Sequence, residues 1–138
     1  MENARKLRIL VAQPGPNSHG RDARVAALSF RDAGFEVVYT GCRQTPEKIV
    51  SAAVQEDVDL IWLNMLWGAH GYFFPRVLEL LRENKAEDIS VAGGGIIPPE
   101  DISMLKATGV KEIFEAGAKL EGIVDWVSNN TKPRQALR

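Results

Sequence analysis

One histidine of this chain lies where it could bind a metal. His19 belongs to the segment PGPNSHG (14–20), which follows the apolar run LRILVA (7–12). Proline and glycine exclude regular structure from that segment, and the apolar run predicts a buried strand of a parallel sheet. A neutral imidazole is a common metal ligand, and open α/β sheets bind ligands beyond the carboxyl ends of their strands. A single loop histidine can equally be a solvated side chain, and these residues alone leave both interpretations open.

Strand-like and helix-like segments alternate five times along the chain. Strands are predicted over 7–12, 35–39, 60–63, 89–92 and 112–114, and helices over 23–33, from 45, over 72–84, from 99 to 109 and over 119–128. Asp22 is the predicted N-cap of the first helix, with Val25 and Leu28 on its buried face, and Thr45 caps the second. Such alternation predicts a parallel sheet that right-handed crossovers cover with helices on both faces. Residues 1–129 are expected to form one domain, and residues 130–138 a frayed C-terminal tail.

Composition excludes several classes of function. The chain has 138 residues, 45% of them hydrophobic, and a formal net charge of −1, so it has no general attraction for nucleic acid or anionic membranes. The single cysteine, Cys42, excludes an internal disulfide framework. No apolar run approaches the ~20 residues of a membrane span, and residues 1–6 lack the apolar core of a signal peptide. We therefore expect a cytoplasmic protein with neither nucleic acid nor membrane as a partner.

Unusual residues also follow the other predicted strands. Asn64, Leu66 and Trp67 come after the third strand and the run Gly93-Gly94-Gly95 after the fourth, and Gly117 comes after the fifth. In a doubly wound sheet the loops after strands one, three and four meet at the carboxyl edge. Glycines let a bulky ring pass close to the backbone, although a glycine run can also cradle a phosphate. The run lacks the Gly-Lys-Ser/Thr ending of a phosphate loop, so it does not match that motif, but both interpretations of the glycines stay open.

Two strings resemble motifs of one enzyme family. The segment NSHGRD (17–22) resembles the cobalamin-binding motif Asp-x-His-x-x-Gly of the adenosylcobalamin-dependent mutases, and GGGIIPP (93–99) resembles the Gly-Gly-x-Ile-Pro-Pro segment of the acyl-CoA mutases. From about residue 5 to 129 the chain is similar to the methylmalonyl-CoA mutase family. This resemblance implies a flavodoxin-like (Rossmann-type) doubly wound five-stranded parallel sheet of order 2-1-3-4-5, which five units of this length also match.

The resemblance further implies the cofactor and its contacts. His19 would replace the dimethylbenzimidazole of adenosylcobalamin as the lower ligand to cobalt, and the displaced nucleotide tail would be buried beside the sheet. The implied cofactor-binding residues are Asn17, Ser18, His19, Gly20, Arg21, Asp22, Asn64, Leu66, Trp67, Gly94, Gly95 and Gly117.

Four of these residues depart from the family pattern. Asn17 replaces the motif's aspartate, so the imidazole would be oriented without a charge and be less basic. Asp22 replaces a glycine near the corrin, and Asn64 replaces the serine of Ser-x-Leu, whose hydroxyl contacts the cofactor tail. Trp67 could stack on the tail or fill the tail pocket. His70, four residues beyond Leu66, is expected to face solvent or a partner chain.

The implied function is that of a subunit. The chain would bind adenosylcobalamin, and a large acyl-CoA mutase subunit would bind the acyl-CoA whose carbon skeleton is isomerised; a GTPase chaperone is a further partner. Without a substrate barrel of ~250 residues, the chain alone should be inactive. Two alternatives stay open: a corrinoid-binding module of a methyltransferase, and a flavodoxin-like regulatory or interaction domain that has lost cobalamin.

Overall fold

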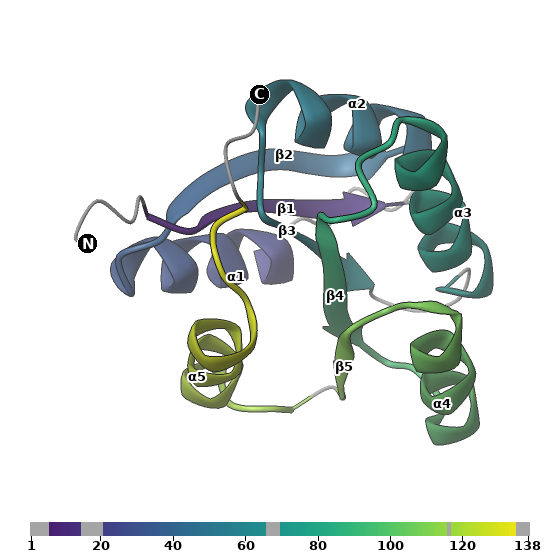
Figure 1. Cartoon of the computed structure of the whole chain (residues 1–138). Coiled ribbons are helices and arrows are strands. Elements are labelled where there is room, and N and C mark those ends of the chain that lie inside the picture. Colours follow the sequence, from purple (N-terminus) through teal and green to yellow (C-terminus); the bar gives the residue numbers. More distant parts are fainter. Residues whose placement is uncertain (1–5, 15–20, 66–69, 116, 135–138) are drawn as a thin grey trace.

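Five parallel strands form one sheet between two layers of helices (Figure 1). The computed structural model describes residues 6–14, 21–65, 70–115 and 117–134. The strands are β1 (Arg8–Pro14), β2 (Glu36–Gln44), β3 (Leu60–Met65), β4 (Ser90–Gly95) and β5 (Glu112–Glu115), and the helices are α1 (Arg21–Asp32), α2 (Pro46–Glu56), α3 (His70–Glu83), α4 (Pro99–Thr108) and α5 (Leu120–Asn130). The strand order β2-β1-β3-β4-β5 confirms the predicted topology.

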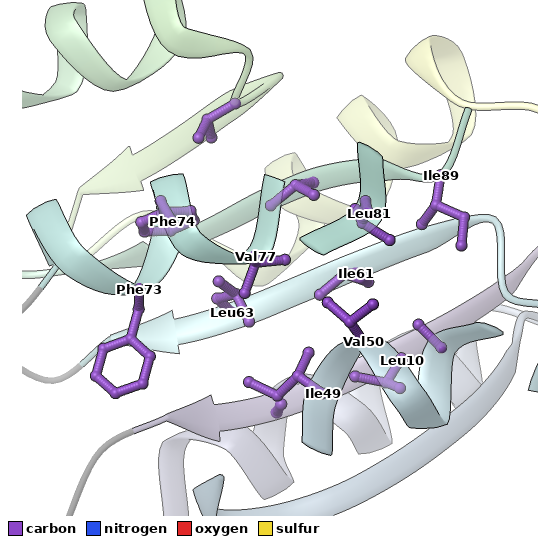
Figure 2. Packing of buried hydrophobic residues seen from close by; sticks show 14 of the residues in the cluster. Leu10, Ile49, Val50, Ile61, Leu63, Phe73, Phe74, Val77, Leu81 and Ile89 are labelled. Carbon is purple, nitrogen blue, oxygen red and sulfur yellow. The ribbon is translucent and has the colours of Figure 1, made fainter. Parts of the chain in front are cut away.

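Both faces of the sheet are buried, which explains the continuous apolar runs. One face packs against α2, α3 and α4, and Figure 2 shows Ile49 and Val50 of α2 with Phe74 and Val77 of α3 over this face. The other face packs against α1 and α5. Strands buried on both sides need apolar residues at nearly every position, because neither face meets water. No helix in the described part of the chain is both long and apolar enough to cross a lipid bilayer.

Helix α1 differs from its prediction at its start and on its buried face. It begins at Arg21, so Asp22 lies in its first turn and is not the N-cap. Val25 and Leu28 are 40% and 42% exposed, whereas Ala23, Ala26 and Phe30 are buried. The small alanines let the helix approach the sheet closely, and so the helix turns its alanine face inward. In α2, by contrast, the predicted cap is confirmed, since the Thr45 side chain accepts a hydrogen bond from the Lys48 backbone N–H.

Strands β3 and β4 extend beyond their apolar runs. Asn64 and Met65 belong to β3, and the three glycines belong to β4, although we expected loops there. The register pairs Leu63 with Gly93, Asn64 with Gly94, and Met65 with Gly95. Backbone pairing requires no side chain, so the ladder continues where the apolar pattern has ended.

The C-terminal segment is anchored as far as Arg134, whereas we expected it to fray. Asp59 is buried, with 2% exposed, and its carboxylate accepts hydrogen bonds from the backbone N–H of Arg8 at 2.8 Å and of Arg134 at 2.7 Å. The Arg134 guanidinium also pairs with Asp57 at 3.0 Å and with Asp88 at 2.9 Å. One carboxylate thus joins the first strand to the segment that follows α5.

Replacing Asp59 by alanine should lower the free energy of unfolding by about 3 kcal/mol or more, because two backbone donors lose a charged, buried acceptor. Guanidinium denaturation measures this change. Asp125→Ala is the matched control, since that aspartate is exposed on α5 and its loss should change stability by less than about 0.5 kcal/mol. Equal effects of the two substitutions would contradict the anchoring role of Asp59.

Candidate functional site

A cavity of about 340 Å³ opens at the carboxyl end of the sheet, on the face covered by α1 and α5. Its lining comes from α1, β3, β4, β5 and the start of α5. Most of the lining is apolar, and Asn64 contributes an amide to it. Val25, Ile96 and Leu120 line it as well and are exposed apolar residues, although large apolar side chains are usually buried. An apolar pocket with few polar groups at a strand end is typical of a ligand site.

Trp62 closes part of this cavity, and sequence analysis missed it. Its side chain is 2% exposed, and its ring lies 5.6 Å from the Phe30 ring and 5.9 Å from the Phe114 ring, centroid to centroid. Its indole N–H donates a hydrogen bond to Oδ1 of Asn64 at 3.4 Å. The available signal was the period of two along a strand, which places residues 62 and 64 on the same face.

The three glycines of β4 have different roles. A Cβ on Gly93 would run into the carbonyl oxygen of Leu63, and one on Gly95, whose φ is +145°, into that of Met65. Both positions therefore need glycine because β3 lies so close. A Cβ on Gly94 would lie 3.0 Å from the carbonyl oxygen of Phe114 and 3.3 Å from the Trp62 ring, and Gly94 lines the cavity. The glycine run is predicted to make room for the ring of a ligand. On the cavity side of Gly94, the ring that lies next to the glycine is the indole of Trp62.

His70 does not face solvent as expected. It begins α3, its side chain is 14% exposed, and its Nε2 lies 2.8 Å from Oδ2 of Asp101 on α4. Its Nδ1 is buried and has no hydrogen-bond partner among the residues that the structure describes. The pair links the starts of two neighbouring helices, a contact between residues 31 positions apart that no local pattern indicates.

The structure brings part of the predicted site together. Asn64, Gly94, Gly95 and Gly117 all line the cavity. Arg21 and Asp22 lie in the first turn of α1, where only their backbone is described. Asn17, Ser18, His19, Gly20, Leu66 and Trp67 lie outside the described residues. Within the described ranges, no three His, Cys, Asp or Glu side chains are grouped as a metal site.

Comparison of the chain with known proteins shows the family to which it belongs. The B12 binding domain matches residues 7–123. The chain belongs to the B12-binding domain family. It is 36% identical over 130 residues to the small subunit of 2-hydroxyisobutanoyl-CoA mutase from Aquincola tertiaricarbonis, covering 94% of this chain and 96% of that protein. It is also 40% identical over 124 residues to the small subunit of pivalyl-CoA mutase from Xanthobacter autotrophicus, covering 90% of this chain and 83% of that protein.

A solved structure supports the fold of this B12-binding domain. A cobalamin-binding protein from Desulfitobacterium hafniense superposes with a TM-score of 0.76 at 16% identity, covering 90% of this chain and 58% of that one. Such low identity shows the architecture alone. The identities to the two small subunits show more, namely that this B12-binding domain is homologous to small subunits of acyl-CoA mutases.

The described residues fit the nucleotide tail of a cobalamin. A flat, aromatic base needs a narrow apolar cleft with a polar group at its end, and the cavity between α1 and α5 offers Phe114 and Trp62 with the Asn64 amide. A Cβ on Gly94 would crowd the Phe114 carbonyl oxygen and the Trp62 ring, so glycine lets these groups pack closely beside the cavity.

Proposed function

We propose that this chain is the adenosylcobalamin-binding subunit of an acyl-CoA mutase. It would act with a large subunit that binds the acyl-CoA substrate and in which the carbon-skeleton isomerisation takes place. The observation that carries the proposal is the apolar cavity at the carboxyl edge of the sheet, in a chain that matches a mutase small subunit along 96% of that subunit's length.

His19 is the proposed lower ligand to cobalt. Strand β1 ends at Pro14 and α1 begins at Arg21, so the chain that carries His19 starts and ends at the carboxyl edge. Asn17 would accept a hydrogen bond from the other ring nitrogen and so orient the imidazole. We assign corrin contacts to the rest of this segment and the start of α1: Ser18, Gly20, Arg21 and Asp22.

The tail contacts are assigned to the cavity. Asn64, Gly94, Gly95 and Gly117 line it, and we place Leu66 and Trp67, which directly follow β3, beside its mouth. These residues would bury the tail and keep water away from it. When bound, adenosylcobalamin supplies a cobalt–carbon bond whose homolysis starts the rearrangement.

Two finer assignments belong to the same proposal. These residues alone should be inactive, because the relatives they match along most of their length are named small subunits and the acyl-CoA would be bound by the large subunit. We also propose a GTPase chaperone for cofactor loading as a further partner. The proposed location is the cytoplasm, with which a single cysteine is consistent.

An absorbance titration tests the proposal. The pure chain is mixed with adenosylcobalamin at neutral pH, alone and with the large mutase subunit of the same organism, and unbound corrinoid is then removed by gel filtration. We expect retained corrinoid with a base-off/His-on, imidazole-ligated spectrum, because an imidazole would replace the tail base at the cobalt. Absence of retained corrinoid from both mixtures would instead support a flavodoxin-like domain without cobalamin.

A further inference from the structure

The contact between Trp62 and Asn64 determines which atom of the amide faces the cavity. An indole N–H can only donate a hydrogen bond, and buried donors are nearly always paired. Trp62 is 2% exposed, and the acceptor that its N–H meets is Oδ1 of Asn64 at 3.4 Å. Exchanging the amide oxygen and nitrogen would point two donors at each other. The indole therefore fixes the orientation of the amide.

The fixed amide leaves a donor for the cavity. Asn64 is only half-buried and lines the cavity, and among the described residues its Nδ2 makes no hydrogen bond. With its oxygen held by the indole, the amide can offer only N–H groups to a ligand. A ligand group at this point must then be a hydrogen-bond acceptor.

The surrounding side chains define the rest of the ligand. The Trp62 ring is tilted by 38° from the Phe114 ring, and both residues line the cavity. Aromatic walls favour a flat aromatic group through stacked or edge contacts. The cavity therefore suits an aromatic heterocycle with an unprotonated ring nitrogen.

We propose that Trp62 is a positioning residue that orients the Asn64 amide to donate to the acceptor nitrogen of a bound aromatic base. The inference rests on the proposed function, in which that base is the end of the corrinoid tail. The inference assigns a role to Trp62 and a direction to the hydrogen bond, from the Asn64 amide to the base. The cavity therefore favours a base with an acceptor nitrogen and disfavours a protonated or donor-bearing base.

The test compares two corrinoids that differ in the tail. Cobalamin carries the base, whereas cobinamide lacks the nucleotide. We define the tail preference as the dissociation constant of cobinamide divided by that of cobalamin, both measured by absorbance titration. Trp62→Phe keeps a ring but removes the N–H, so the amide can rotate and the preference should fall about fivefold. Trp126→Phe is the matched control, because Trp126 packs on Phe114 without lining the cavity, and its preference should stay at the wild-type value.

Two further variants separate orientation from packing. Asn64→Asp is nearly isosteric but offers only oxygens, so the tail preference should fall about tenfold even with Trp62 intact. Asn64→Ser places a rotatable hydroxyl there, which needs no orientation by the indole, so adding Trp62→Phe to Asn64→Ser should cost no further preference. This lack of an added effect is a result that loss of packing would not produce.

Each outcome decides a different question. If the wild-type protein binds neither corrinoid, the proposed function fails. If it binds cobalamin more tightly than cobinamide but Trp62→Phe and Asn64→Asp both keep that preference, the positioning role is overturned and the proposed function stands. A wild-type protein that binds both corrinoids equally would show that the tail does not enter the cavity, which overturns the inference as well.

Discussion

Replacing Gly95 by alanine is expected to destabilise the protein by at least about 3 kcal/mol and to send much of it into aggregates. The φ of Gly95 is +145°, which L residues with a side chain rarely adopt, and the new methyl group would run into the carbonyl oxygen of Met65. Gly95 and the Met65 carbonyl both belong to the backbone of paired strands. Neither can move without breaking the hydrogen-bond ladder between β3 and β4. The free energy of unfolding in guanidinium is the measurement.

Gly122→Ala is the matched control for this substitution. Gly122 lies inside α5, and a Cβ there meets nothing within 4 Å. Alanine is favoured over glycine in a helix interior by about 1 kcal/mol, so this variant should be more stable than the wild-type protein. If Gly95→Ala cost less than about 1 kcal/mol, the close approach of the two strands would be refuted.

Replacing His19 by alanine is expected to weaken binding of adenosylcobalamin at least tenfold and to remove the imidazole-ligated spectrum. The reason is that the outer-shell partners of a ligating histidine alone contribute about 10–100-fold to metal affinity, so loss of the ligand itself should cost no less. The segment 14–20 is predicted from its proline and glycine residues to be a loop, so the free energy of unfolding should change little. Absorbance titration and guanidinium denaturation measure the two effects separately.

The second histidine provides the contrast. The chain has two histidines, and His70 is held by Asp101 at 2.8 Å. His70→Asn should keep the imidazole-ligated spectrum, because only His19 is the proposed ligand. Retention of that spectrum in His19→Ala together with its loss in His70→Asn would reverse the assignment.

The composition and order of the residues predicted a doubly wound parallel sheet, whereas the strand order 2-1-3-4-5 was implied by the family resemblance. Continuous apolar runs such as 7–12 arise because both sheet faces are covered, and five alternations of strand and helix leave few topologies that obey right-handed crossovers. Turn and cap chemistry is equally local, and so the start of α2 at Thr45 and Pro46 could be predicted from adjacent residues. The segment that carries His19 is predicted to be a loop from its glycine and proline residues, and it lies outside the residues that the structure describes.

Only the tertiary structure decided how the site is built. The structure shows Asp59 joining β1 to the segment after α5, the pair of His70 and Asp101, and the need for glycine at position 95. Each of these depends on residues distant in sequence. Local periodicity records whether a side chain is buried but not what it is buried against. Trp62 shows this limit most clearly: its apolar character predicted a strand, and only the packing of α1 and α5 over that strand made its indole the wall of a ligand cavity.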